Sequence, residues 1–309
     1  INNDGGGTIT ARGVVWSTSQ NPTTALTTKT VDGTGVGNYL STISGLSPNT
    51  LYYIRAYATN TTGTAYGNQV ETRTGVSLTI ETSLIPAGTF MIGSPASEQQ
   101  RDTNEVQHQV TLSAFRMSKY EVNNEQYAAF LNAKGIGSNG LYAGGAYPTQ
   151  ALVFQSDNLT WSGTQWEPLL GKENFPVAYI PWYGALEFAT YSGGRLPTEA
   201  EWEYACRGNL TTPFSTGNCL SNTQANYQWS TPLTGCTNTI TSSPGQTQPV
   251  NSYLPNSYGL YNMHGNIWEW CADWYGAYPN IPQSNPTGPA NGSKRVVRGG
   301  SWYNDAGGC

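Results

Sequence analysis

Residues 255–275 read PNSYGLYNMHGNIWEWCADWY, and the fold of the chain depends on this stretch. Asn and Gly, which favour turns, crowd its first half. Its second half is an aromatic run in which we expect a strand over Ile267–Trp270. Nine of the ten tryptophans of the chain lie in residues 84–309. We therefore treat these residues as one part of the chain, in which packed aromatic rings dominate.

Three helices are predicted upstream of this stretch. The first covers Glu121–Lys134, where aromatic and aliphatic side chains share one face behind an Asn cap. The second covers Pro181–Ser192. The third, Glu199–Arg207, begins at a capping box, in which the Thr198 hydroxyl accepts a hydrogen bond from the backbone of Glu201 and the Glu201 carboxylate reaches back. Residues 84–309 are therefore expected to form an α+β domain.

The composition predicts a loop-rich chain. Charged residues make up 11% of the 309 residues, against about 25% in an average soluble domain. Gly (36) and Pro (18) are abundant, and long irregular loops are expected at 135–175 and 208–250. The 14 Lys and Arg residues are spread thinly and the net charge is −5, which argues against a nucleic-acid partner. No run of 18 apolar residues occurs, so we expect no transmembrane segment.

Residues 1–75 have a different pattern, with strands and no helix. Alternating apolar and β-branched residues mark strands at Ile9–Ser17, Tyr39–Ile43, Leu51–Thr59 and Ala65–Thr72. The stretch GLSPNTLYYIRAYATNTTGTAYG (45–67) resembles fibronectin type III modules of bacterial surface proteins. The resemblance implies an all-β sandwich that is partial, because its first strand is missing. We expect residues 76–83 to be a short linker.

A sandwich that lacks a strand has an open edge. We expect this edge next to Tyr39–Ile43 or Leu51–Thr59. Either residues upstream of Ile1 fill the gap, or another molecule donates a strand, which would link subunits into a homo-polymer. The sequence supports both alternatives equally.

Five blocks within residues 84–309 carry a second resemblance. They are IPAGTFMIGS (85–94), YEVNNEQYAAFL (120–131), GRLPTEAEWEYACRG (194–208), the stretch 255–275 and RVVRGGSW (295–302). In content and order they resemble the formylglycine-generating enzyme, or sulfatase-modifying factor, family. The resemblance implies a loop-rich, C-type-lectin-like fold for residues 84–309 that is cut short before the closing strands of the family.

The same resemblance bears on catalysis. Enzymes of this family oxidise a sulfatase cysteine to formylglycine with a copper ion, which two cysteines hold after a GGS motif. Here the segment reads GGSWYNDAGGC. Ser301 matches the family serine and Cys309 the second cysteine, whereas Asn304 stands in place of the first. A carboxamide oxygen is a hard, neutral ligand and a poor replacement for a thiolate on copper(I). We therefore expect no copper at this degenerate site and no formylglycine generation.

Histidine is scarce, since only His108 and His264 occur. A related branch of the family uses non-haem iron on a cluster of histidines, which two residues cannot supply. The scarcity also weakens Ser-His-Asp and Cys-His hydrolase hypotheses. We expect His108, within VQHQVTL, to be a surface strand residue, and His264 to be a turn residue.

The resemblance also implies one metal site, which binds calcium in members of the family. The matching ligands are the Asn262 side chain, the carbonyls of Gly265 and Ile267, and the Glu269 carboxylate. Carbonyls at i and i+2 of an extended segment point the same way, so this spacing suits a hard cation. Without an ion, the residues would be only a turn. A second family calcium site would begin at Asn226, but residues 235–248 contain no acidic partner for it.

Five cysteines lie in the last third of the chain, without the CxxC spacing of a zinc site. Cys219 and Cys236 bracket one loop and are the first pairing that we expect. Cys271 and Cys309 could form a second pair. The family resemblance implies that Cys206 pairs with a cysteine beyond Cys309. This cysteine usage, together with the low Lys content, indicates an exported protein.

The main functional hypothesis is a non-catalytic extracellular or cell-surface protein that binds a protein or glycan, or assembles with other subunits. An adhesin, a filament subunit and a phage receptor-binding protein all fit this hypothesis. One alternative is an enzyme of the sulfatase-modifying factor family that oxidises a protein cysteine to formylglycine. Another is a scaffold of bacterial gliding or secretion machinery.

Overall fold

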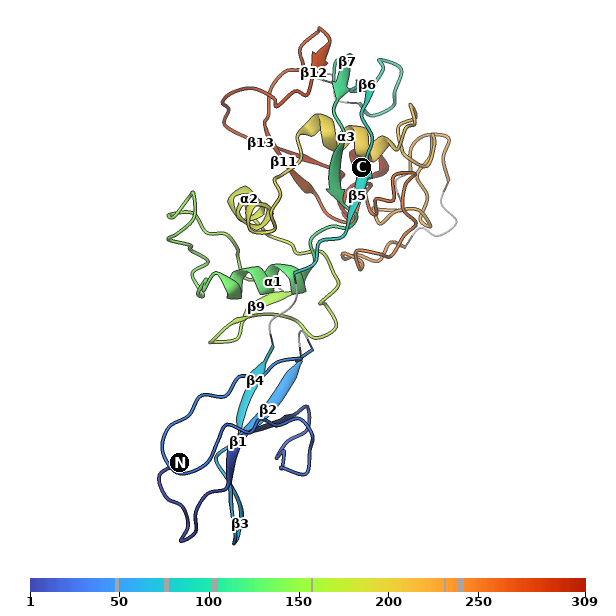
Figure 1. The fold of residues 1–309 in the computed structure, drawn as a ribbon. Coiled ribbons are helices and arrows are strands. Elements are labelled where there is room, and N and C mark those ends of the chain that lie inside the picture. The colour runs from blue at the N-terminus through green and yellow to red at the C-terminus, as the bar shows by residue number, and fades with distance from the viewer. Residues whose placement is uncertain (48–49, 75–77, 102–104, 157, 231, 238–241) are drawn as a thin grey trace. The chain divides into compact units, whose positions relative to one another are not determined.

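The computed structural model describes the chain except for residues 48–49, 75–77, 102–104, 157, 231 and 238–241 (Figure 1). The chain divides into two compact units, Ile1–Ser77 and Leu78–Cys309. Residues 76–77 of the expected linker lie outside the described residues. The last two linker residues, Thr82 and Ser83, belong to a strand instead.

The first unit contains one antiparallel sheet. Its strands are β1 (Ala11–Ser17), β2 (Leu51–Asn60), β3 (Gly63–Tyr66) and β4 (Val70–Arg73). β2 is the central strand: it pairs with β1 on one side, and on its other side with β4 near its start and β3 near its end (Figure 1). Val15 and Tyr57 are buried in this unit. The Tyr57 hydroxyl donates to the carbonyl of Thr30 at 2.6 Å, and this hydrogen bond holds the loop at Thr30 against β2.

This sheet differs from the expected sandwich. The described residues of the first unit form a single sheet, with no second sheet packed on it. Tyr39–Ile43 is not a strand, because side chains anchor it: the Tyr39 hydroxyl donates to Gly13 and the Ser41 hydroxyl to Asp32. Ala65–Thr72 is two strands rather than one, since each pairs with a different half of β2. A fibronectin type III sandwich is therefore not what these residues show.

The expectation of an open edge beside Leu51–Thr59 is wrong. Both sides of β2 are paired within the chain. The outer edge of β1 is also bonded, because Thr30 N donates to Val14 O at 2.9 Å and Asp32 N donates to Arg12 O at 2.7 Å. Segment 28–33 thus covers the outer edge of β1.

The three helices expected in the second unit are confirmed. They are α1 (Asn124–Ala133), α2 (Trp182–Tyr191) and α3 (Glu199–Arg207). A capping box starts α1 at Asn123 and another starts α3 at Thr198. Each box uses only residues within one helical turn, which is why sequence identifies it. No helix in the described parts of the chain is long and apolar enough to cross a membrane.

Short strands complete the second unit, in four small sheets. The strand pairs and triplets are β5 (Thr82–Ile85) with β8 (Phe115–Ser118); β6 (Gly88–Ile92) with β7 (His108–Leu112) and β12 (Gln283–Ser284); β9 (Leu159–Trp161) with β10 (Trp166–Pro168); and β11 (Glu269–Trp274) with β13 (Arg295–Arg298). The aromatic strand expected at Ile267–Trp270 thus begins two residues later, at Glu269.

Three clusters of buried side chains hold the second unit together. The first includes Trp202 of α3 and Cys271 of β11, and the second includes Phe130 of α1 and Phe188 of α2. The third cluster is small and packs the irregular loop after α3 against Ala306, in the 3-10 turn Ala306–Gly308. This last cluster holds the segment that follows the GGS motif.

Replacing the cap residue Thr198 with alanine should lower the free energy of unfolding by about 1 kcal/mol. The backbone N–H of Glu201 would lose the hydroxyl oxygen that it contacts at 3.2 Å. Urea unfolding followed by circular dichroism measures the change. Thr164→Ala, at an exposed loop position, is the matched control and should cost less than about 0.5 kcal/mol. Equal costs for the two variants would contradict the capping role.

Candidate functional site

The calcium-type motif folds as a tight turn rather than as an extended segment. Asn262, Gly265 and Asn266 all have left-handed backbone angles, with φ of 52°, 75° and 62°. Ile267 N donates to Gly265 O at 2.8 Å, so one of the two expected carbonyl ligands already accepts a hydrogen bond. The alternation of carbonyls that we expected along 265–269 is therefore wrong.

Gly265 is required where this turn meets a neighbouring loop. A Cβ atom at residue 265 would lie 2.2 Å from the carbonyl oxygen of Asn226, a distance that excludes any side chain. Asn266 N donates to that same oxygen at 2.7 Å, and Gly265 N donates to Gly299 O at 2.6 Å. The turn thus touches both the loop at Asn226 and the GGS segment.

The side chains of the motif fit a hard cation. Asn262 is buried, and its Oδ1 atom has no hydrogen-bond partner in the part of the chain that the structure describes. Glu269 accepts a hydrogen bond from the Trp202 indole at 2.8 Å through Oε2. Burial raises the pKa of Glu269 to about 7, because the charged form loses its hydration. An oxygen-ligated cation would satisfy the amide oxygen and stabilise the carboxylate charge.

Glu121 is a further member of this site, and sequence reasoning missed it. Its side chain accepts from the Asn262 amide at 2.8 Å and from the Asn266 amide at 3.0 Å. Burial raises the pKa of Glu121 well above its usual value, and the nearby charge of Glu269 raises it further. The one signal in the sequence is a lone carboxylate just before the cap of a buried helix.

A cavity of about 650 Å³ opens beside these two carboxylates. Its wall combines Glu121 and Glu269 with aromatic rings, among them Trp202, Tyr261, Trp268 and Trp270. In the described parts of the chain, no three His, Cys, Asp or Glu side chains gather as a metal-binding group, so a metal here would also need amide oxygens as ligands. The oxygen set around Asn262 and Glu269 is therefore the arrangement that we consider for a metal.

The residues after the GGS motif bring one thiol to the degenerate copper site. The Ser301 hydroxyl donates to Asn304 Oδ1 at 2.6 Å, so the amide oxygen is already engaged. The Cys309 thiol lies 3.3 Å from the carbonyl of Asp305 and donates to it. Burial raises the pKa of Cys309 to about 12, which keeps the thiol protonated near neutral pH. The arrangement supplies one protonated thiol and one amide oxygen.

His264 lies in a bend, as expected, and its side chain is packed there. It is 6% exposed, and the backbone N–H of Ser215 donates to its Nε2 atom at 3.0 Å. Its Nδ1 atom lies 3.2 Å from the carbonyl of Cys309 and must therefore carry the proton. The Ser215 hydroxyl is also 3.0 Å from Nε2. Because the backbone N–H already uses that lone pair, the pair does not form an activated serine.

His108 was expected on a surface strand, and the strand is confirmed as β7. The side chain is 6% exposed, however, and contacts the Tyr278 ring edge-on. The expected surface position of the His108 side chain is therefore wrong. Side chains alternate along β7, and those of residues 108, 110 and 112 point into the core.

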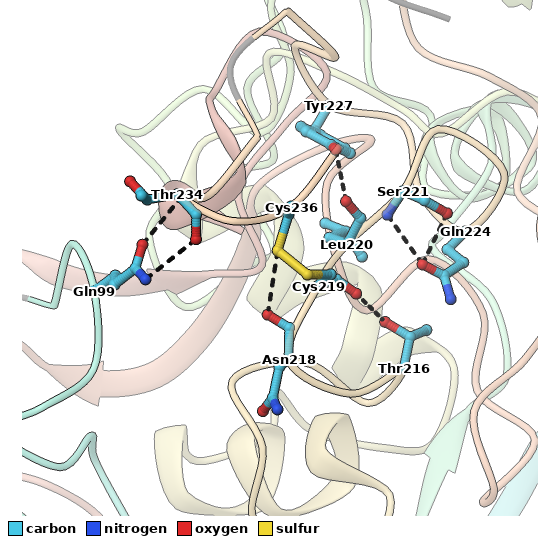
Figure 2. Close-up of a disulfide and its surroundings, with 10 residues drawn as sticks. All are labelled: Gln99, Thr216, Asn218, Cys219, Leu220, Ser221, Gln224, Tyr227, Thr234 and Cys236. Atoms are coloured by element: carbon cyan, nitrogen blue, oxygen red, sulfur yellow. Dashed lines mark hydrogen bonds between the residues drawn. A yellow bond between two sulfur atoms is a disulfide. The ribbon is translucent and has the colours of Figure 1, made fainter. Parts of the chain in front are cut away.

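Cys219 and Cys236, the first pairing that we expected, are joined by a disulfide (Figure 2). Cys206, Cys271 and Cys309 are free thiols, so the structure does not contain the second pairing that we considered. Figure 2 shows Gln99 bonded to both the N–H and the carbonyl of Thr234 in the disulfide-closed loop. Within the same loop, Gln228 N donates to Asn304 O at 2.8 Å. The loop thus braces the segment that carries the degenerate site.

The burial of His264 predicts a loss of stability in acid. Its pKa falls from 6.5 to about 4 because burial disfavours the imidazolium. The unfolded chain takes up this proton first as the pH falls, so the stabilisation is present above about pH 6.5 and is lost toward pH 4. The difference corresponds to about 3 kcal/mol.

Denaturant unfolding from about pH 7 to about pH 4 tests this expectation on the natural chain and His264→Gln. The gap in unfolding free energy between them should close by about 3 kcal/mol as the pH falls. Glu121 and Glu269, whose pKa values are raised, act in the opposite direction, but they contribute to both proteins and cancel in the difference. A gap that is independent of pH would show that folding does not change the pKa of His264.

Comparisons with known proteins identify the family. The sulfatase-modifying factor enzyme 1-like domain matches residues 68–309. The formylglycine-generating enzyme of Mus musculus is 33% identical over 244 residues, which cover 71% of this chain and 65% of that protein. The formylglycine-generating enzyme of Thermomonospora curvata is 34% identical over 257 residues, covering 71% and 81%.

Two further relatives complete the comparison. The inactive C-alpha-formylglycine-generating enzyme 2 of Bos taurus is 30% identical over 254 residues, covering 74% of this chain and 79% of that protein. The solved structure of PvdO from Pseudomonas aeruginosa superimposes with a TM-score of 0.54 at 25% identity, covering 73% and 84%. The chain spans 65% of the length of the mouse relative. With the fold, the motifs and these matches in agreement, the chain belongs to the sulfatase-modifying factor enzyme 1-like family.

Proposed function

We propose that this chain is a non-catalytic binding member of its family, exported from the cell and stabilised by calcium. The observation that carries the proposal is Asn304, whose side chain bonds to Ser301 where a copper thiolate would be needed. Cys309 alone, held as a protonated thiol, is a poor copper(I) ligand. The bovine relative that is named inactive supports a family member of this kind.

The cavity beside Glu121 and Glu269 supports a binding role. Its volume of about 650 Å³ falls in the range of ligand-binding clefts, roughly 300–1,000 Å³. Aromatic rings such as Trp268 and Trp270 offer flat apolar contacts, and the carboxylates accept hydrogen bonds. A protein side chain or a glycan would use both kinds of contact. The disulfide in the loop after α3 supports export, since disulfides persist in oxidising compartments.

Formylglycine generation is the second candidate, and the comparisons favour it. The mouse and Thermomonospora curvata relatives are both named formylglycine-generating enzymes. Ser301 and Cys309 keep two of the three residues that the family resemblance assigns to the site. Under this candidate, Cys309 would supply the family chemistry without the first cysteine.

One assay separates the two candidates. The protein is incubated with copper(I), oxygen and a peptide that carries a sulfatase-type cysteine motif, and mass spectrometry detects the aldehyde. We expect no aldehyde above the level without protein, because one thiol does not form a two-thiolate copper site. Turnover at an enzyme-like rate would overturn our proposal and establish the second candidate.

A gain-of-ligand variant checks the alignment behind this expectation. Asn304→Cys should bind copper(I) more tightly than the natural chain, and Thr164→Cys, an exposed thiol elsewhere, should not. Equal affinities for the two variants would mean that residue 304 does not face Cys309 as proposed.

Calcium binding at Asn262 and Glu269 is the second part of the proposal. Calcium at about 100 times its dissociation constant should raise the free energy of unfolding by about 2.7 kcal/mol. Glu269→Gln should abolish the increase, because it removes the charge of the ligand set, while its amide oxygen can still accept from Trp202. Differential scanning calorimetry with calcium or a chelator measures the effect. Glu167→Gln, at an exposed strand position, is the control and should respond like the natural chain. If calcium does not stabilise the natural chain, the calcium proposal is wrong.

A further inference from the structure

Two buried amide oxygens lie in one connected network and have no hydrogen-bond partner among the described residues. They are Oδ1 of Asn226 and Oδ1 of Asn262, whose residues are 0% and 7% exposed. A buried polar atom without a partner destabilises the fold, because it has lost its hydrogen bonds to water. The two unpartnered oxygens therefore destabilise the network, and a ligand that bound to them would remove this destabilisation.

Glu121 is at the centre of this network. Asn262 Nδ2 donates to Glu121 Oε2 at 2.8 Å, and Asn266 Nδ2 donates to Glu121 Oε1 at 3.0 Å. Asn226 Nδ2 donates in turn to Asn266 Oδ1 at 2.9 Å. Hydrogen bonds therefore connect the carboxylate to both amides, directly to Asn262 and through Asn266 to Asn226.

Glu121 acts together with backbone carbonyls in setting how these amides are turned. Asn262 Nδ2 also donates to Val250 O at 3.2 Å, Asn266 Nδ2 to Gln248 O at 3.1 Å, and Asn226 Nδ2 to Gln246 O at 3.0 Å. Both oxygens of the Glu121 carboxyl group accept hydrogen bonds here, so Asn262 and Asn266 present their NH₂ groups to Glu121. Asn262 Oδ1 consequently points away from Glu121. Asn266 Oδ1 also points away, and there it accepts from Gln248 N at 2.8 Å and from the Asn226 amide. Asn226 turns its NH₂ group toward Asn266, so Asn226 Oδ1 points away from Asn266.

We infer that Glu121 is the positioning residue of the cation site, because it accepts from the amide of Asn262 and leaves Asn262 Oδ1 free to act as a ligand. The inference rests on the proposed calcium site. Glu121 need not touch the ion, since it acts through the amides. It also anchors the site to the segment just before α1, 141 residues away in sequence from Asn262.

Glu121→Gln tests this role, because it keeps the size of the side chain and changes its polarity. The oxygen of the introduced amide can still accept from Asn266, but the NH₂ group of that amide then faces Asn262. Asn262 would turn its oxygen toward residue 121 and its NH₂ group toward the ion. Loss of such a positioning contact typically lowers metal affinity about 10- to 100-fold, and we expect a loss in this range.

Asn262→Asp in the Glu121→Gln background provides the rescue. The NH₂ group introduced at residue 121 then donates to one oxygen of the carboxylate introduced at residue 262, and the other oxygen of that carboxylate faces the ion. Affinity should return to within about threefold of the natural chain if the polarity of the pair decides the orientation of the ligand. Glu199→Gln replaces a largely buried carboxylate that bonds to Tyr278, outside the network. It is the matched control and should leave the affinity unchanged.

Binding is measured by calcium calorimetry and by terbium luminescence sensitised through Trp202, whose indole contacts Glu269. Melting in chelator shows whether each variant is folded. If the natural chain binds no calcium, the calcium proposal fails and the inference with it. If the natural chain and Glu121→Gln bind equally, only the inference fails. If Glu121→Gln does not fold, the double variant decides: calcium binding by a folded double variant supports the inference, and its absence overturns it.

Discussion

Backbone hydrogen bonds of the left-handed turn at Gly265 and Asn266 hold the second unit's functional region together. Gly265 N donates to Gly299 O, Asn266 N to Asn226 O, and Trp302 N to Asn266 O at 3.2 Å. The loop at Asn226, the turn and the GGS segment therefore share one set of contacts. In a region with little regular secondary structure, such contacts replace the ladder of a sheet. Any side chain at residue 265 would separate these three segments.

The two candidate metal positions have diverged chemically within this common frame. The position at Asn262 and Glu269 offers oxygen atoms, which suit hard cations, and its amide oxygen is free. The position at Asn304 and Cys309 would require soft thiolates, and its amide oxygen is already bonded to Ser301. At the second position, Asn304 alone makes the difference: its amide oxygen bonds to Ser301 and is not available to a metal ion. The fold itself does not depend on that residue's metal chemistry.

Sequence predicts best what neighbouring residues decide. The capping boxes at Asn123 and Thr198 lie within single helical turns, and α1 and α3 form where they indicate. Glu121 could not be assigned, because its partners Asn262 and Asn266 are 141 and 145 residues away. The first unit was misread for a similar reason. Strand-like alternation does not say whether Ala65–Thr72 pairs as one strand or, as here, as two on different halves of β2.

The separation of the cysteines in space has a practical consequence for producing the protein. Cys219 and Cys236 are 17 residues apart in a surface loop, so they meet readily during oxidation. Cys206 and Cys271 are 5% and 0% exposed, and burial raises the pKa values of both thiols. Thiol–disulfide exchange needs an accessible thiolate. Once the core has formed, these two thiols are poor partners for exchange with Cys219 or Cys236, and Cys309 is the more exposed of the three free thiols.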